Sequence, residues 1–451
     1  MKNLRTITTD FFNTSSINES VLTKSLSAGM ESIYDSAMSS SLPVPETEYV
    51  YQKELRPMFG KQGLNTNSVG AHPDFSELSG GEVERHYIAT LFVDIKGSTR
   101  LNLIVDDLES AFLIKNRILQ AAIDVVRSLD GHPHRLMGDA LMAFFGGKGV
   151  KKEDAIADAV NASAMIRLVM KESVFPYLDD HLNTNTNLAV RVGVDFGDSQ
   201  EVLWARYGFD GANEVTAQGL RVDCAAKLQS NASSNQAMLG DSLLGFIDFP
   251  SVFRERKTKR RGDQTEEVPF MLPNITDIEN KSINYPMYHL NSSIYSRLLP
   301  IPTSWKAVLS DISGVVDHPA IKGYGCHVEE DGVWSEYKSA SRFLKSALNL
   351  KFTLEATRDF VNRCGGLEVT FTKQNHGIEA GDDTAPYESK KVIKPSFSRT
   401  MNQYLKCELS EGTSYRGLHT MKVTVRAVNK PSVVLFQDWI GVYILGKDGG
   451  R

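Results

Sequence analysis

The spacing of apolar and polar positions divides the chain into segments with strand-like and helix-like periods. Between residues 87 and 239, short apolar strand patterns alternate with longer amphipathic helical patterns. This order predicts an α+β domain in which helices cover one face of a sheet. The predicted strands are Tyr87 to Asp94, a pair around Gly138 and Asp139, Leu188 to Phe196 and Gln236 to Leu239, and the predicted helices are Asp106 to Leu129, Glu153 to Val169 and Leu220 to Gln229.

The same patterns predict four parts. Residues 1–80 combine short helical patterns with Ser-, Thr- and Asn-rich stretches, which is typical of a helical and linker extension. Residues 81–250 hold the α+β domain, and residues 251–316 form a basic hairpin and a connector. Residues 317–451 predict a strand-rich α+β domain with a helical cover. Its predicted elements are a helix from Glu336 to Asn349 and strands at Lys351 to Thr357, Leu367 to Thr372, Thr420 to Ala427 and Val433 to Leu445.

Composition narrows the class of protein. The chain has 451 residues, 41% of them hydrophobic, and a net charge of -5, so it is long enough for two or three globular domains and has no overall attraction to nucleic acid. It contains neither an apolar leader segment nor an apolar run of about 18 residues. We therefore expect a cytoplasmic protein without membrane contact. Its cysteines lack Cys-x-x-Cys spacing, which argues against structural zinc or a disulfide framework; they are Cys224, Cys326, Cys364 and Cys407.

One basic run could suggest nucleic-acid binding. Arg254 to Arg261 carries six basic residues and precedes the turn residues Gly262 and Asp263. The acidic pair Glu266 and Glu267 then faces this run across the predicted hairpin. The pattern therefore favours a solvated hairpin over a nucleic-acid contact.

Two aspartates carry the strongest chemical signal. Asp94 and Asp139 each lie where an apolar strand gives way to a glycine turn, so each carboxylate is carried to the rim of a sheet. Carboxylate oxygens are preferred ligands of Mg²⁺ and Mn²⁺, and substrate phosphates commonly complete the shell. Gly97, Ser98 and Thr99 follow the first aspartate at a predicted strand-to-helix turn, whose small residues and backbone N–H groups can cradle a polyphosphate. Either aspartate alone is equally typical of a surface turn.

A third segment, from Thr216 to Lys227, adds two charged residues on one helix face. Asp223 and Lys227 are spaced i and i+4, so they can reach one ligand together. An ordinary salt bridge is the alternative interpretation of this spacing.

In their order along the chain, these segments resemble the catalytic domain of class III nucleotidyl cyclases. The segment from Phe92 to Thr99 resembles that family's Phe-x-Asp-Ile-x-Gly-Phe-Thr pattern, and Arg135 to Asp139 resembles its Lys-x-x-Gly-Asp hairpin. Arg191 to Gly197 is similar to the family's Arg-Ile-Gly-Ile-His-x-Gly strand. The resemblance implies a ferredoxin-like fold and two Mg²⁺ or Mn²⁺ ions per active site, bound by Asp94, Asp139 and the backbone carbonyl of Ile95.

Other residues depart from the adenylyl cyclase pattern. Arg135 and Thr216 stand at the positions that read the base, and Asp223 and Lys227 stand where the family has an Asn and an Arg for the ribose and the transition-state phosphate. These departures, with the C-terminal part, resemble the pyrimidine cyclases of bacterial Pycsar antiphage systems. The C-terminal part itself resembles the sensor domain of some adenylyl/guanylyl-type cyclases.

The resemblance implies a homodimer with shared active sites, and a cyclic nucleotide product that acts on a separate effector. Arginine offers only donors, which suit the adjacent acceptors O2 and N3 of cytosine better than the N3 donor of uracil. We therefore expect CTP to be converted to cyclic CMP, with cyclic UMP as the second alternative and cyclic GMP as the third. A degenerate cyclase that only binds a nucleotide is a further alternative.

Overall fold

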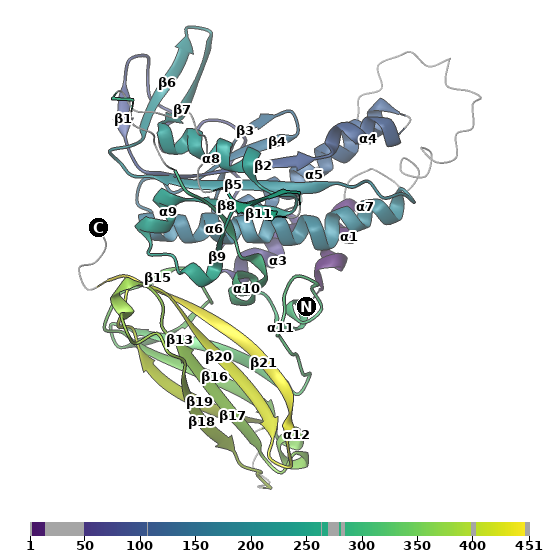
Figure 1. Cartoon of the computed structure of the whole chain (residues 1–451), viewed down its shortest axis with the longest axis vertical. Helices are drawn as coiled ribbons and strands as arrows, with labels where there is room; N and C mark the ends of the chain where they lie inside the picture. Colours follow the sequence, from purple (N-terminus) through teal and green to yellow (C-terminus); the bar gives the residue numbers. More distant parts are fainter. Residues whose placement is uncertain are drawn as a thin grey trace.

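The structure is a computed structural model that describes residues 2–13, 49–105, 107–262, 264–268, 279–280, 285–397 and 403–446. Figure 1 shows two parts: a layered part of helices and strands above, and an elongated stack of strands below. The predicted helix start at Asp106, the turn residue Asp263 and the polar stretches at 14–20 and 36–41 lie outside the described residues.

A mixed sheet of seven strands forms the centre of the upper part, in the order β3-β4-β2-β5-β8-β12-β9. Neighbouring strands are antiparallel except β5 and β8, which are parallel. The four strand regions predicted between residues 87 and 239 are confirmed, and so is the α+β class of this part. The strands are β2 (Ile88–Lys96), β3 (His132–Met137), β4 (Ala140–Phe145), β5 (Ala189–Gly197), β8 (Gln236–Gly240), β9 (Arg254–Arg256) and β12 (Met287–Leu290).

Helices cover both faces of this sheet. On one face, α6 packs on β2 and β5, whose apolar side chains include Val192 and Val194, and α5 packs beside it on β3 and β4. On the other face, α8 approaches so closely that a Cβ added at Gly193 would lie 2.2 Å from the backbone nitrogen of Gln229. The prediction of helices on a single face is therefore wrong, because β5 is buried from both sides. The helices here are α4 (Ser98–Ile104), α5 (Leu108–Ser128), α6 (Lys152–Val169), π-helix η1 (Met170–Val174), α7 (Phe175–His181), α8 (Leu220–Asn231) and α9 (Asp241–Phe246).

Local sequence explains where α5 and α6 form. The side chain of Asp107 caps α5 by accepting a hydrogen bond from the backbone nitrogen of Ser110 at 2.8 Å. In α6 every residue from Ala155 to Val169 is buried, so this helix is surrounded by protein on all sides.

A small second sheet with the order β1-β6-β7 lies beside the main sheet and was not predicted. Val215 and Ala217 of its last strand pack with Trp204 against the main sheet, which leaves Glu214 and Thr216 on the opposite face of the strand. The strands are β1 (Val83–Arg85), β6 (Leu203–Phe209) and β7 (Ala212–Gln218). The basic hairpin forms as predicted from β10 (Thr258–Arg261) and β11 (Gln264–Glu267), with Lys259 paired to Glu266.

Two N-terminal helices, α1 (Leu4–Asn13) and α3 (Val50–Met58), join the same hydrophobic core as α5 and α6. The backbone nitrogen of Tyr51 donates to Asp124 of α5 at 2.7 Å, and the Gln52 amide donates to the same carboxylate at 3.0 Å. These bonds fix α3 on α5, the helix that leads into β3.

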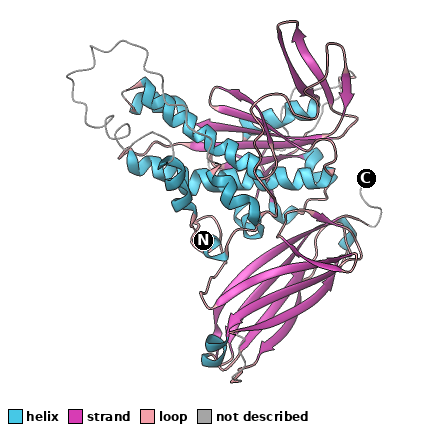
Figure 2. Cartoon of the chain, turned by 180° about the vertical axis from the view of Figure 1, so that it is seen from behind, coloured by secondary structure: helices cyan, strands magenta, loops and turns pink. Residues whose placement is uncertain are grey.

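The lower part is a sandwich of two sheets, with orders β14-β13-β16-β19 and β15-β21-β20-β17-β18. Figure 2 shows that strands dominate it. The sheets enclose a second hydrophobic core. Their strands are β13 (Ile321–Glu330), β14 (Val333–Tyr337), β15 (Phe343–Leu344), β16 (Asn349–Thr357), β17 (Leu367–Gln374), β18 (Tyr387–Ile393), β19 (Tyr404–Gly412), β20 (Gly417–Ala427) and β21 (Lys430–Ile444).

The predicted helix from Glu336 to Asn349 is wrong. This segment contains the end of β14, the short strand β15 and turns in which Ala340 and Ala347 have φ angles of 51° and 63°. Glu336 and Tyr337 pair with β13, and Phe343 and Leu344 pair with β21, so sheet pairing and the turns that follow each pair override the helical composition of the segment. Short helices complete the chain: η2 (Ser251–Phe253), α10 (Ser292–Tyr295), η3 (Ser296–Leu298), α11 (Thr303–Lys306), α12 (Arg358–Arg363) and η4 (Ile378–Ala380).

Buried polar contacts join the sandwich to α6. Asn161 donates its side-chain amide to the backbone oxygen of Ala340 at 2.7 Å and accepts from the Tyr295 hydroxyl at 2.9 Å. The Tyr295 and Tyr443 hydroxyls lie 3.2 Å apart. The core of the upper part also includes side chains of β15 and β21, so this core extends onto one end of the sandwich, which keeps its own second core.

Candidate active site

The two predicted metal-binding aspartates lie at the same end of the central sheet. Asp94 is near the end of β2, where it is paired in register with Ala140 at the start of β4. Asp139 is the residue before Ala140, in the turn between β3 and β4. Rigid pairing of β2 with β4 therefore brings together two carboxylates that are 45 positions apart in the sequence.

Each carboxylate has one partner that the sequence did not reveal. Oδ2 of Asp94 accepts from Nε of Arg191 at 3.0 Å and also from its Nη2. Oδ2 of Asp139 accepts from the Ser98 hydroxyl. Among the residues that the structure describes, no donor reaches Oδ1 of either aspartate. The signal for Arg191 was present in its strand motif, but only the β2–β5 register places it opposite Asp94.

The turn after β2 has the predicted strand-to-helix form. Gly97 has a φ of 90°, and a Cβ at this position would lie 3.1 Å from the backbone oxygen of Asn187. Helix α4 then begins at Ser98, which is buried, whereas Thr99 is exposed. The side chain of Ile95 packs in the core, so only its backbone can face a ligand. Ser98 thus orients Asp139, in addition to any contact with substrate.

The two predicted base contacts lie in neighbouring elements. Arg135 is on β3, the edge strand of the main sheet, and its Nη2 donates to Oε1 of Glu214 on β7. Glu214 is two residues before Thr216 on the same strand face, so the ion pair brings Arg135 near Thr216. Sequence reasoning missed Glu214, because it lies in a hairpin that the apolar pattern did not indicate.

Asp223 and Lys227 lie on α8, as predicted, but they do not form a salt bridge with each other or with another described residue. Asp223 is exposed and Lys227 is half-buried. The last turn of α8 reaches the aspartates through Arg191, whose Nη1 lies 3.5 Å from the backbone oxygen of Ser230. Asp223 and Lys227 therefore remain available for a ligand, whereas Arg221 of the same helix is paired with Glu201.

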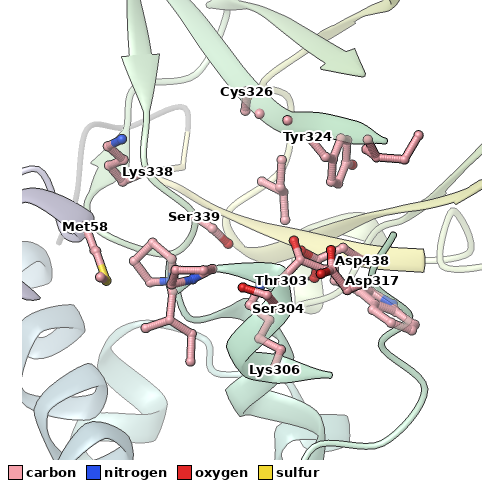
Figure 3. Close-up of a pocket in the computed structure, with 18 of the residues that line it drawn as sticks. Met58, Thr303, Ser304, Lys306, Asp317, Tyr324, Cys326, Lys338, Ser339 and Asp438 are labelled. Carbon is pink, nitrogen blue, oxygen red and sulfur yellow. Dashed lines mark hydrogen bonds and ion pairs between the residues drawn. The ribbon is translucent and has the colours of Figure 1, made fainter. Parts of the chain in front are cut away.

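A large cavity of the described part of the chain lies elsewhere. It has a volume of about 720 Å³ and lies between α3, α11 and the sandwich, as Figure 3 shows, and none of the predicted site residues lines it. At its floor, Asp438 of β21 accepts from Nζ of Lys306 at 3.0 Å and from the Thr303 hydroxyl at 2.7 Å. Lys306 and Asp438 are both buried, so this ion pair fixes the connector against the sandwich.

Two properties of the described part of the chain restrict the kind of site it can form. It contains no helix long and apolar enough to cross a membrane. It also contains no group of three or more His, Cys, Asp or Glu side chains that could hold a metal. A metal at Asp94 and Asp139 would therefore need ligands from the backbone, water or substrate.

Comparison with known proteins identifies the family of the chain. Residues 313–445 match the model of the Adenylyl/Guanylyl and SMODS C-terminal sensor domain. A cytidylate cyclase of Escherichia coli is 42% identical over 415 residues, which cover 90% of this chain and 89% of the relative. A cytidylate cyclase of Staphylococcus aureus is 31% identical and covers 91% of this chain and 89% of its own length.

Solved structures with a similar arrangement include the adenylyl cyclase CyaB from P. aeruginosa. It is 20% identical, with a TM-score of 0.37, and the match covers 46% of this chain and 95% of that one. The resemblance to nucleotidyl cyclases with a C-terminal sensor domain, drawn from the sequence, is confirmed by the relatives and the matched domain. The chain belongs to the cytidylate cyclase family of nucleotidyl cyclases.

Proposed function

We propose that this protein converts CTP to 3′,5′-cyclic CMP and diphosphate at the sheet end that carries Asp94 and Asp139. The observation that supports this most is the adjacency of the two carboxylates, fixed by the β2–β4 register in a chain whose relatives are named cytidylate cyclases. Residues 81–250 would form the catalytic part, and residues 317–451 the sensor part.

The donor set fits two divalent cations. Asp94 and Asp139 supply oxygens, the preferred ligands of Mg²⁺ and Mn²⁺, and Oδ1 of each has no partner among the described residues. Such ions supply the positive charge that acidifies a ribose hydroxyl and neutralises a leaving diphosphate. Arg191 and Ser98 would hold the two carboxylates in place by their Oδ2 atoms, and the backbone carbonyl of Ile95 would add a ligand.

The reaction needs one bond formed and one broken. The ribose 3′ oxygen loses its proton and bonds to the α-phosphorus, and the bond from that phosphorus to the bridging oxygen breaks, which releases diphosphate. Lys227, with no ion-pair partner among the described residues, would stabilise charge on the transferring phosphoryl group. Asp223 would face the ribose hydroxyls, and Gly97, Ser98 and Thr99 would approach the phosphates.

The active sites would be shared between two copies of the chain. In this arrangement, Asp94 and Asp139 of one subunit act with Arg135, Thr216, Asp223 and Lys227 of the other. Mixing Asp139→Ala protein with Lys227→Ala protein should then restore partial activity, because one of the two sites in a mixed dimer contains no substitution. No recovery in dimers shown by mass spectrometry to be mixed would contradict shared sites.

The resemblance of the sequence to the pyrimidine cyclases of antiphage systems suggests a biological setting. We propose that the enzyme works in the cytoplasm as a second-messenger synthase of antiphage defence, and that cyclic CMP activates a separate effector protein. Phage protection by the gene together with its effector, lost on Asp139→Ala substitution, would test this setting.

The direct test is incubation of the full chain with ATP, GTP, CTP and UTP separately in Mg²⁺ or Mn²⁺, with products identified by mass spectrometry. We expect cyclic CMP from CTP and little product from the other nucleotides. Cyclic UMP as the main product would contradict the proposed substrate but not the reaction, and no cyclic product from any nucleotide would contradict the reaction itself.

A further inference from the structure

We propose that Glu214 is the residue that lets this enzyme distinguish cytosine from uracil, acting together with Arg135. This inference rests on the proposed function and deepens it. Nothing in the sequence motifs points to Glu214, and its role follows from the contact that the fold creates.

The first step is the geometry of the pair. Nη2 of Arg135 donates to Oε1 of Glu214, and this contact joins the edge strand of the main sheet to the β6–β7 hairpin. The remaining guanidinium donors and Oε2 of Glu214 have no other partner among the described residues. The two side chains thus present a row of N–H donors directly beside a carboxylate acceptor.

The second step is exposure. The side chains of Arg135 and Glu214 are 36% and 43% exposed, so the pair can meet a ligand without any rearrangement of the core. An ion pair this exposed adds little to folding stability. Thr216 lies two residues after Glu214 on the same face of β7, and its neighbours Val215 and Ala217 anchor the strand in the core. Glu214 is therefore carried by an anchored strand, two residues before Thr216, which is buried, and Arg135 reaches it from β3.

The third step is complementarity with the base. Cytosine presents an amino donor at N4 next to acceptors at N3 and O2. Oε2 of Glu214 can accept from N4, while Arg135 donates to N3 and O2. Uracil reverses the first two groups, so its O4 would face the carboxylate and its N3–H would face the guanidinium. A site built to hydrogen-bond one pattern rejects the other, because its own polar groups are left unpaired.

The two purine bases share parts of this hydrogen-bonding pattern. Adenine also has an amino donor beside a ring acceptor. Guanine has an acceptor that can face the guanidinium and donors that can face the carboxylate. Glu214 therefore decides between the two pyrimidines, whereas the discrimination against purines must come from other features.

The test compares turnover of CTP and UTP by the full-length wild type and the Glu214→Gln variant. A glutamine amide can offer either its oxygen or its NH₂, so it no longer prefers the cytosine pattern. We expect the ratio of kcat/KM for CTP to that for UTP to fall by roughly 5- to 150-fold, the range typical of one lost base contact. Glu84→Gln is the matched control. Glu84 lies on β1 of the same small sheet and forms a surface ion pair with Lys148.

The outcomes separate the inference from the proposed function. A wild type that does not make cyclic CMP contradicts the proposed function, whatever the variant does. A wild type that makes cyclic CMP and a Glu214→Gln variant with the same CTP-to-UTP ratio contradict the role of Glu214 alone. An equal loss of turnover with CTP and UTP would also overturn the role of Glu214 in base selection, because that result indicates a structural role of the ion pair. Thermal unfolding of each variant shows whether the fold is retained.

Discussion

Charged side chains are arranged in opposite ways at the proposed catalytic end of the sheet, called the catalytic end below, and at the junction with the sandwich. At the catalytic end, Arg135 and Glu214 are more than one third exposed, and Oδ1 of Asp139 has no described partner. At the junction, Lys306 and Asp438 are only 3% and 7% exposed, and each makes further hydrogen bonds.

The two ion pairs differ in how easily a ligand can replace one partner. Exposed ion pairs contribute little to stability, so a ligand can replace one partner at low cost. Breaking a buried pair leaves an uncompensated charge in the interior, which is strongly destabilising. The comparison predicts that substitutions at the catalytic end impair turnover and leave the fold intact, whereas substitutions at the junction impair the fold.

The largest effect should come from Asp139→Asn, which removes a proposed metal ligand but keeps the shape of the side chain. We expect kcat to fall by about three orders of magnitude or more. Without the Asp139 negative charge, the metal ions that would stabilise the reacting phosphate are held less tightly. The measurement is cyclic CMP formation by mass spectrometry, with unfolding in urea as the check on folding. Activity within tenfold of wild type would contradict the assignment of Asp139.

The next effect should come from Asp438→Ala, which leaves the Lys306 ammonium buried without its carboxylate. We expect the free energy of unfolding to fall by about 3–5 kcal/mol. Glu355→Ala is the control, because Glu355 forms an exposed pair with Lys406 and should cost less than about 1 kcal/mol. If urea unfolding shows similar losses of stability in both variants, the contrast between buried and exposed ion pairs is contradicted.

A third prediction concerns the pH dependence of stability. Asp195 is fully buried on β5 and hydrogen-bonded by Tyr285, and burial raises its pKa to about 7. The folded protein then holds this proton up to about pH 7, whereas the unfolded chain releases it near pH 4. The stabilisation from this group is therefore complete at low pH and is lost as the pH rises toward 7, by up to about 1.4 kcal/mol per pH unit.

Asp195→Asn should remove this contribution, since an amide does not ionise. We expect the free energy of unfolding to decline less between pH 5 and 8 in the variant than in the wild type. Parallel curves for the two proteins would show that Asp195 does not ionise differently in the folded and unfolded states.

The smallest effect should come from Gly325→Ala in β13, at the wall of the large cavity. A Cβ added there meets nothing within 4 Å, so the methyl group fills empty space, and we expect a change of less than about 1 kcal/mol, in the stabilising direction. Gly193→Ala is the contrasting control, because its Cβ would collide with the backbone of α8. A large loss of stability in Gly325→Ala would show that the cavity wall is tightly packed.

Local sequence was sufficient for the parts of the molecule where pattern and environment agree. The strands that carry Asp94 and Asp139 are apolar runs that end in glycine turns, and the structure places them as predicted. The helix predicted at 336–349 is wrong because two short stretches of the segment pair with β13 and with β21, and each is followed by a turn with a positive φ angle.

The partners of the site residues could not be predicted, for a different reason. Arg191 lies 97 positions from Asp94, and Glu214 lies 79 positions from Arg135. Such contacts depend on strand order and register, which a single sequence does not specify. The hairpin with Glu214 was not predicted because its apolar residues do not mark one buried face: Val215 and Ala217 are buried, whereas Tyr207 and Phe209 are exposed.

The burial of α6 has a consequence for the modularity of this protein. One side of this helix supports the catalytic sheet, and Asp154 and Asn161 are hydrogen-bonded to the segment that leads into and begins β15 of the sandwich. Removing the sandwich would uncover apolar surface that is now interior, and it would leave these polar groups without their partners. A truncated enzyme should therefore aggregate, and an exchange of the sensor by gene fusion would succeed only if the incoming domain carried a matching surface for this helix.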